Sequence, residues 1–151
     1  MNPAASADDG ALLARVAAIA RRHGLSHAPV TRYDSGSLPV LALGAEHVLK
    51  LYPAQDRAHA QVEADVLTFI DGRLPLPTPA VLATGTQDDG FYLLMSQLRG
   101  RRLVDAWPEL APARRDGLCD RLGEAIAALH ALDSAPLAGL PRGDGGAWST
   151  A

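Results

Sequence analysis

The sequence predicts an α+β fold in which five short strands form one antiparallel sheet and helices lie before, between and after the strands. Three observations lead to this prediction. Apolar residues recur with helical spacing near the start, the middle and the end of the chain. In 28–52 and 81–97 they instead alternate or form short runs between turn residues, which is typical of strands. The length of 151 residues is that of one domain, or of one lobe of a larger protein.

The first predicted helix has about 16 residues, judged from its apolar spacing and end signals. Ser6 and Asp9 have the spacing of a capping box at its start, and Gly24 supplies its end. Its expected apolar face consists of Leu12, Leu13, Val16, Ile19 and Ala20. Strands are then predicted at 30–33, 38–43 and 48–52, joined by tight turns as a meander.

A second helix is predicted over 58–71, after Pro53 ends the third strand and before Gly72. The proline-rich stretch 74–79 predicts an extended connector. Two further strands are expected at 81–86 and 91–97, and Asp89-Gly90 between them indicates a tight hairpin.

The remaining chain is predicted to be helical, with a short piece near 103–107 and a long helix over 113–132. The long helix has the clearest amphipathic pattern in the sequence. Its apolar stripe contains Leu118, Leu122, Ala125, Ile126, Leu129 and Leu132. Residues 133–151 are rich in Gly, Pro and small side chains without periodicity, which predicts a linker or a frayed end.

Composition excludes several classes of protein. Hydrophobic residues make up 48% and charged residues 21% of the chain, as in ordinary soluble globular proteins. The formal net charge of -3 offers no basic surface to a polyanion, so nucleic acid is not expected as a partner. A single cysteine, the lack of a secretory pattern at the N-terminus and the lack of a long apolar run predict a cytoplasmic protein with no membrane partner.

Lys50 is the only lysine among the 14 basic residues, and it lies in the middle of an apolar strand. A buried ammonium must meet a negative charge or reach the surface along its stem. Glu63, on the helix that follows and on the side of its apolar residues, is the best candidate partner. Two interpretations remain open. Lys50 is either a lysine that reaches solvent from an edge strand, or a cation that neutralises nucleotide phosphates while Glu63 holds it.

The turn between the first two strands, residues 34–37, contains Ser35, Gly36 and Ser37. Such small residues would let backbone N–H groups approach an anion. Taken by itself, the segment is more commonly an ordinary turn between antiparallel strands.

The order of these features resembles the small lobe of protein-kinase-like folds, and the sequence is similar to the aminoglycoside phosphotransferase and choline-kinase-like enzymes. These features are a turn that would cover the nucleotide phosphates, a lysine on the third strand, a glutamate on the next helix and two further strands. The similar stretches are 48–53, 62–69, 74–81, 92–100 and 122–132. Together they cover residues from about 28 to 135 in the family's order and spacing.

The resemblance implies a domain organisation and a set of nucleotide-binding residues. It implies a nucleotide-binding N-terminal lobe over 1–97, a hinge over 98–100, the start of a helical C-terminal lobe over 101–135, and a linker or disordered tail over 136–151. The residues expected to bind the nucleotide are Lys50, Glu63, Ser35, Gly36, Ser37, Val48, Met95, Ser96 and Leu98.

Each of these residues has a role implied by the resemblance. Lys50 would contact the phosphates and Glu63 would pair with it, while residues 35–37 would cover the phosphates. The carbonyl of Ser96 and the N–H of Leu98 would face adenine. Met95 would line the back of that pocket, and filling the core accounts for a methionine there as well.

The implied reaction is transfer of the γ-phosphoryl group of ATP, or of GTP, to a hydroxyl of a small-molecule acceptor, with Mg²⁺. The family's catalytic loop, His-Gly-Asp followed by Asn five residues after the Asp, does not occur here, nor does the later metal-binding Asp. Arg142-Gly143-Asp144 imitates it by chance, because Ser149 stands at the Asn position. We therefore expect no catalytic and no metal-binding residue in this chain.

Two expectations follow from that difference. First, the family's acceptor-binding C-terminal lobe is expected to be missing, so that the chain is inactive alone. Second, the apolar stripe on the long helix would then be exposed, and this exposure would lower the stability of the chain or favour its self-association. The alternative function is a non-catalytic nucleotide-binding or interaction module.

Overall fold

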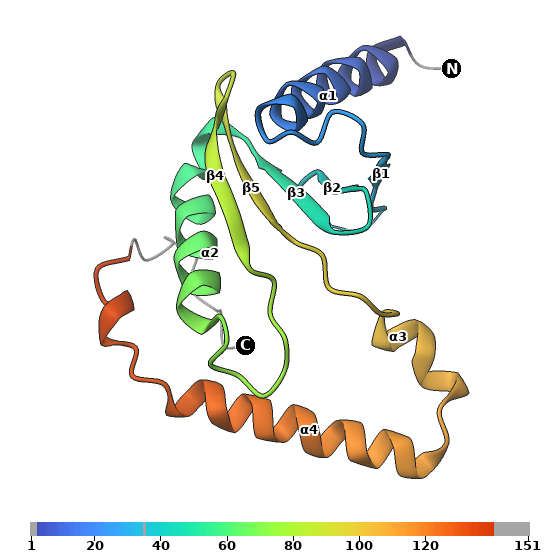
Figure 1. The fold of residues 1–151 in the computed structure, drawn as a ribbon, viewed down its shortest axis with the longest axis vertical. Helices are drawn as coiled ribbons and strands as arrows, with labels where there is room; N and C mark the ends of the chain where they lie inside the picture. Colours follow the sequence, from blue (N-terminus) through green and yellow to red (C-terminus); the bar gives the residue numbers. More distant parts are fainter. Residues whose placement is uncertain (1–2, 35, 141–151) are drawn as a thin grey trace, which may run out of the picture.

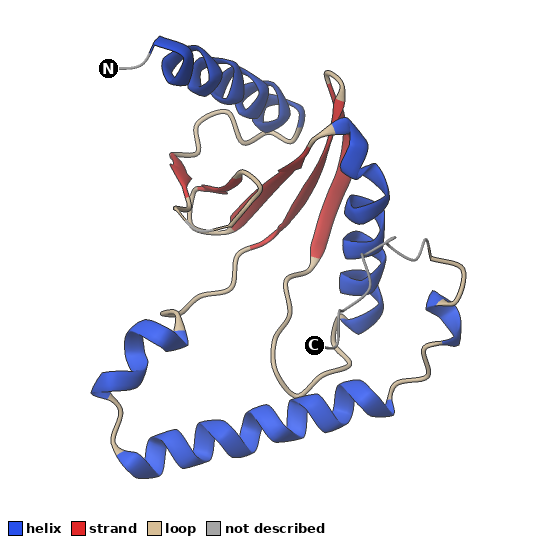
Figure 2. Cartoon of the chain, turned by 180° about the vertical axis from the view of Figure 1, so that it is seen from behind, coloured by secondary structure: helices blue, strands red, loops and turns tan. Residues whose placement is uncertain are grey.

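The computed structural model describes residues 3–34 and 36–140, and its fold is the α+β arrangement predicted from the sequence (Figures 1 and 2). In chain order the elements are α1 (Pro3–Arg22), β1 (Val30–Arg32), β2 (Val40–Leu43), β3 (His47–Tyr52), η1 (Ala54–Asp56), α2 (Arg57–Ile70), β4 (Val81–Gln87), β5 (Gly90–Ser96), α3 (Leu103–Ala106), η2 (Trp107–Glu109), α4 (Pro112–Ala131) and η3 (Ala135–Leu137).

The five strands form one antiparallel sheet in the order β1-β2-β3-β5-β4. α2 therefore carries the chain from β3 to the far edge, and β5 returns to pair with β3. Lys50 pairs with Val40 of β2 on one side and with Leu93 of β5 on the other. Lys50 thus lies on the central strand, and the edge-strand interpretation is wrong.

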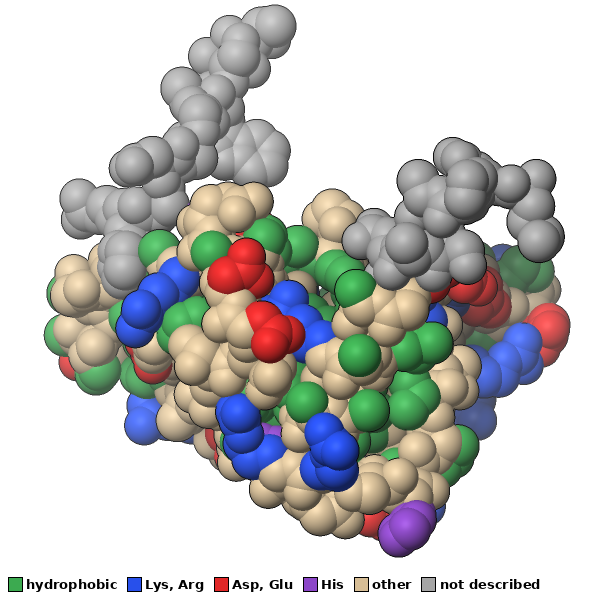
Figure 3. Space-filling view, turned by 90° about the horizontal axis from the view of Figure 1, so that it is seen from above, with side chains coloured by type: hydrophobic (Ala, Val, Ile, Leu, Met, Phe, Trp, Pro, Cys, Tyr) green, Lys and Arg blue, Asp and Glu red, His purple; other side chains and the backbone are tan. Residues whose placement is uncertain are grey.

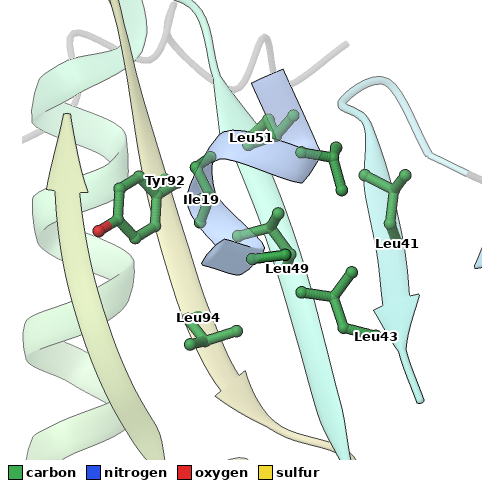
Figure 4. Close-up of a cluster of buried hydrophobic side chains, with 9 residues drawn as sticks. Ile19, Leu41, Leu43, Leu49, Leu51, Tyr92 and Leu94 are labelled. Atoms are coloured by element: carbon green, nitrogen blue, oxygen red, sulfur yellow. The ribbon is translucent and has the colours of Figure 1, made fainter. Parts of the chain in front are cut away.

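The sheet separates two apolar clusters because side chains alternate between its faces. On one face α1 places Val16, Ile19 and Ala20 against the sheet. The partners of α1 in this cluster are Leu41, Leu43, Leu49, Leu51, Tyr92 and Leu94, and Figure 4 shows Ile19 among them. On the opposite face α2 contributes Ala60 and Ala64, which pack with Tyr52, Leu93 and Met95.

The start of α1 differs from the predicted capping box. The helix begins at Pro3, so Ser6 lies inside it and is not its N-cap. Proline suits the first helical turn and alanines follow it, so the helix extends further towards the N-terminus than predicted. Its end is as predicted: Gly24 has a φ of +72°, and the N–H of Leu25 donates to the carbonyl of Ala20 over 2.8 Å.

The hairpin between β4 and β5 is present, but Gly90 is a strand residue and not the turn residue that was predicted. Gln87 pairs with Gly90, so the turn residues are Asp88 and Asp89, and Asp88 takes the positive φ of 54°. Gly90 is a buried strand residue. A Cβ on it would lie 2.5 Å from the carbonyl oxygen of Tyr52 and would collide with the guanidinium of Arg15.

Arg15 uses that space to tie α1 to two strands. Its guanidinium donates to the carbonyl of Tyr52 on β3 over 3.3 Å and to the carbonyl of Phe91 on β5 over 3.2 Å. Tyr52 and Phe91 are paired residues in the sheet. The absence of a side chain at Gly90 therefore allows a helix on one face to hold the ends of two neighbouring strands.

Beyond β5, an extended segment leads away from the sheet to α3 and α4 (Figure 1). The stripe of α4 is exposed at Leu122, Ile126 and Leu129, which remain 50%, 46% and 44% accessible, whereas its Ala125 is buried. Within the predicted tail, residues 135–137 form the short helix η3. Residues 141–151, with the Arg142–Asp144 tripeptide and Ser149, lie outside the described residues. None of the helices in the described part of the chain has the length and hydropathy needed to cross a bilayer.

We predict that Gly90→Ala destabilises the protein by about 1–3 kcal/mol, because overfilling a packed site forces the backbone or Arg15 to move. Urea denaturation followed by circular dichroism measures this change. Gly10→Ala is the matched control, because a Cβ there meets nothing within 4 Å. An exposed helical position should gain up to about 1 kcal/mol from the same substitution. Equal stability of Gly90→Ala and the wild type would contradict the prediction.

Candidate functional site

The structure contains the predicted ion pair between Lys50 and Glu63. The Lys50 Nζ lies 2.7 Å from Glu63 Oε2, and the side chains are 23% and 34% exposed. β3 turns Lys50 towards the face that α2 covers, and α2 turns Glu63 back towards the sheet. The small Ala60 and Ala64 beside Glu63 are buried and let the helix approach. The ammonium is therefore held at a partly open edge of the α2 face.

Tyr52 is a member of this site that the sequence analysis missed. It stands two residues after Lys50 on β3 and hence on the same face. The Lys50 Nζ lies 5.2 Å from the centre of its ring, within the range of a cation–π contact. The side chain is only 1% exposed, and the Glu63 carboxylate is the polar group beside its hydroxyl. The spacing of Lys50 and Tyr52 on a strand was the available signal.

The charged environment of Tyr52 affects its ionisation. Burial, and then the Glu63 carboxylate through a hydrogen bond and through its charge, raise the pKa of Tyr52 above its usual value of 10.0. Both causes have the same sign, because a phenolate would lose its hydration and would stand beside a negative charge. Tyr52 is therefore held in its neutral, hydrogen-donating form.

An apolar surface adjoins Lys50 on the same face. Ala42 of β2 pairs with Val48 of β3, and Val48 pairs with Met95 of β5, so the three form one row across the sheet. The neighbouring row is Val40, Lys50 and Leu93. Side chains in such rows are in contact across the strands. The structure thus brings Val48 and Met95 beside Lys50, and adds Val40 and Ala42, which the sequence analysis did not select.

The predicted phosphate loop lies before β2. Gly36 has a φ of +112°, which favours glycine, and Ser35 lies outside the described residues. A shallow surface depression is lined by Arg32, Tyr33, Asp34, Gly36, Ser37 and Leu38. Because Val40 pairs with Lys50, the loop precedes the row of Lys50 by only three residues. No hydrogen bond within the described chain joins Gly36 or Ser37 to Lys50 or Glu63.

The predicted hinge begins where β5 ends. Ser96 is fixed to Ala80, whose N–H donates to the Ser96 hydroxyl over 2.8 Å and whose carbonyl accepts from the Ser96 N–H over 2.9 Å. The Gln97 N–H donates to the carbonyl of Glu46 over 2.8 Å. Leu98 follows on the surface and is 47% exposed. The adenine contacts assigned to Ser96 and Leu98 remain predictions.

The donor set for a metal is a separate question. Among residues 3–34 and 36–140, no group of three or more His, Cys, Asp or Glu side chains lies close enough together to hold a metal ion. Mg²⁺ requires several oxygen ligands in near-octahedral geometry. The described residues alone therefore do not fit a magnesium site, although they present a cation for phosphate oxygens.

The raised pKa of Tyr52 predicts that stability decreases above about pH 10. The folded protein keeps the phenolic proton at a pH where the unfolded chain has lost it, so this contribution is complete below pH 10 and decreases as the pH rises. The slope should reach about 1.4 kcal/mol per pH unit for one proton. Chemical denaturation at pH 8–11.5 measures it.

The matched comparison uses two phenylalanine variants. Tyr52→Phe should have a shallower decrease than the wild type, whereas Tyr33→Phe, which removes a hydroxyl from a 41% exposed side chain, should follow the wild type. Parallel curves for the wild type and Tyr52→Phe would show that Tyr52 does not cause the decrease.

Comparison with known families shows the family of the chain. The model of the phosphotransferase enzyme family, APH, matches residues 29–150. The match includes all five strands, α2, α3 and α4, whereas α1 lies outside it. No curated protein matches the chain with significant similarity. The family match covers most of the chain, and the chain therefore belongs to the phosphotransferase enzyme family.

Proposed function

We propose that this chain binds a nucleoside triphosphate on the α2 side of its sheet and forms the nucleotide-binding part of a small-molecule phosphotransferase. The observation that carries the proposal is the ion pair between Lys50, the only lysine of the chain, and Glu63 on α2. ATP is the proposed nucleotide, with GTP as the other candidate. The proposed acceptor is a small molecule with a hydroxyl group, as in the aminoglycoside and choline-kinase-like branches.

Energetics favour a functional reason for the pair. A partly exposed ion pair contributes only about 0–1 kcal/mol to stability, and taking two charges out of water has its own cost. Arginine provides every other basic side chain of this protein. A lysine offers a compact ammonium that can point at phosphate oxygens, whereas arginine is a rigid planar fork. An ammonium that is fixed by a carboxylate and still partly exposed to solvent is suited to bind a nucleotide phosphate.

The surroundings of Lys50 fit the other parts of a nucleotide. The row of Ala42, Val48 and Met95 places mostly buried apolar side chains beside Lys50, as the wall of a base pocket requires. Ligand sites typically combine such apolar walls with a few fixed polar groups. The loop at Gly36 and Ser37 lies at the N-terminal end of β2, near the row of Lys50, where it could cover phosphates.

The chemical step requires groups that this site does not contain. Phosphoryl transfer needs a carboxylate to orient the attacking hydroxyl and oxygen ligands to hold Mg²⁺. The described residues contain no acidic cluster for the metal, and the sequence does not contain the His-Gly-Asp pattern of the family's catalytic loop. We therefore propose that they bind and orient the nucleotide, and that these residues do not complete the transfer by themselves.

A non-catalytic binding or interaction module is the second candidate function. It is favoured by the same lack of an acidic metal-ligand cluster in the described part of the chain. Nucleic acid is not proposed as a partner of either function. The net charge is -3, and acidic and basic side chains are interspersed on the face shown in Figure 3.

We predict that Lys50→Met raises the dissociation constant for ATP about tenfold or more, because a charge-assisted hydrogen bond contributes about 1.5–3 kcal/mol. Isothermal titration calorimetry measures this constant. Lys50→Arg keeps the charge and should also bind ATP less tightly, while its unfolding midpoint stays close to that of the wild type. Arg73→Met, which removes a cation near Phe69 at the end of α2, is the control. ATP binding by the wild type that does not respond to Lys50→Met would place the nucleotide elsewhere.

We also predict that the chain releases no more phosphate from ATP and Mg²⁺ than Lys50→Met does, because the described residues contain no acidic cluster for the metal and the sequence lacks the His-Gly-Asp pattern of the catalytic loop. A coupled phosphate-release assay measures the rate. Turnover by the wild type well above that of Lys50→Met would show that the chain is catalytically complete and would reject the second candidate function.

A further inference from the structure

The end of β5 has a side-chain hydrogen bond where a backbone one is expected. Ser96 lies opposite Ala80, and two residues that are hydrogen-bonded across an antiparallel ladder exchange both of their N–H···O=C bonds. The Ser96 N–H donates to the Ala80 carbonyl over 2.9 Å, as in such a pair. The Ala80 N–H instead donates to the Ser96 hydroxyl over 2.8 Å. The Ser96 carbonyl is therefore left out of the pairing with Ala80.

The strand on the other side, β3, does not engage this carbonyl either. The Gln97 N–H donates to the carbonyl of Glu46, so residues 95 and 97 turn their backbone groups towards β3. Ser96 lies between them and opposite His47, and its backbone groups point the other way. Within the described residues, neither neighbouring strand therefore supplies a donor to the Ser96 carbonyl.

This carbonyl adjoins the apolar row of Ala42, Val48 and Met95, because Met95 comes directly before Ser96 on β5. A base that packs on the row beside Lys50 would have one edge at the end of β5. Adenine carries the N6 amino group, a donor, at the position where guanine carries the O6 acceptor. A carbonyl without a donor from the sheet suits the amino group, whereas a second carbonyl oxygen would repel it.

We propose that Ser96 is a positioning residue whose hydroxyl takes the Ala80 N–H out of the strand pairing and so leaves the Ser96 carbonyl to accept from the N6 amino group of adenine. This inference rests on the proposed nucleotide site and selects ATP over GTP within it. Serine hydroxyls compete with backbone groups for hydrogen bonds of this kind. Without the hydroxyl, the Ala80 N–H would donate to the Ser96 carbonyl in the regular way, in competition with the base.

The test compares two nucleotides that differ only in the amino group. Purine riboside triphosphate has the ring and the triphosphate of ATP but lacks N6. Isothermal titration calorimetry of the full chain with Mg²⁺ measures both dissociation constants. The wild type should bind ATP about fivefold more tightly than purine riboside triphosphate, as one hydrogen bond provides. Ser96→Ala should bind ATP about fivefold less tightly than the wild type, and purine riboside triphosphate within about twofold of it.

Two further variants separate this effect from a loss of structure. Ser96→Thr keeps the hydroxyl on a residue that suits a strand, and it should keep the wild-type ratio of the two dissociation constants. Ser134→Ala removes a hydroxyl that makes no capping hydrogen bond at η3, and it should leave both constants unchanged. Circular dichroism melting curves establish that each variant is folded at the temperature of the titration.

Lys50→Met is the reference for the nucleotide site itself, because loss of the phosphate contact should weaken the binding of both nucleotides alike. Equal weakening of the two nucleotides by Ser96→Ala, or no weakening of either, overturns this inference, while a response to Lys50→Met leaves the proposed site in place. Loss of the preference for ATP in Ser96→Thr overturns the inference as well. A wild type that binds neither nucleotide overturns the proposed function, and the inference with it.

Discussion

The contact between one ammonium on the central strand and one carboxylate on α2 organises the α2 face of this protein. It fixes how α2 lies on the sheet, because Glu63 meets Lys50 only where the small Ala60 and Ala64 let the helix approach. It also sets the chemistry of the face. A cation placed on a β-strand among apolar side chains needs a nearby anion. Because the Glu63 side chain is 34% exposed, a second anion from solvent can still reach the Lys50 ammonium.

The two faces of the sheet divide structural and chemical tasks. The α1 face is closed by leucines, Ile19 and Tyr92, and the Tyr92 hydroxyl there contacts Arg22 and His23. The α2 face holds the ion pair and, beside it, the buried Tyr52 side chain. A charged pair set among apolar residues contributes little net stability, so its place on this face indicates where the fold serves something other than its own stability.

The sequence predicts the order and type of the elements well, because the apolar periodicity changes clearly between helix and strand. It also predicts Glu63 as the partner of Lys50, since burial of a charge restricts the choice. It does not predict features that depend on pairing register. Val40 and Ala42 join the site only because β2 lies opposite Lys50 and Val48. Gly90 was assigned to a turn, but its small size serves Arg15, a residue distant in sequence. Local signals also gave the wrong start for α1, where helix propensity extended the helix past Ser6.

Arg15 connects the divided faces. From the α1 face it donates hydrogen bonds to the carbonyls of Tyr52 and Phe91, and the Tyr52 ring lies on the opposite, α2 face. α1 lies before residue 29, where the similarity to the phosphotransferase family begins. A domain cut at that boundary would therefore lose the guanidinium that holds the strands behind the α2 face, and would expose the leucines of the α1 face to water.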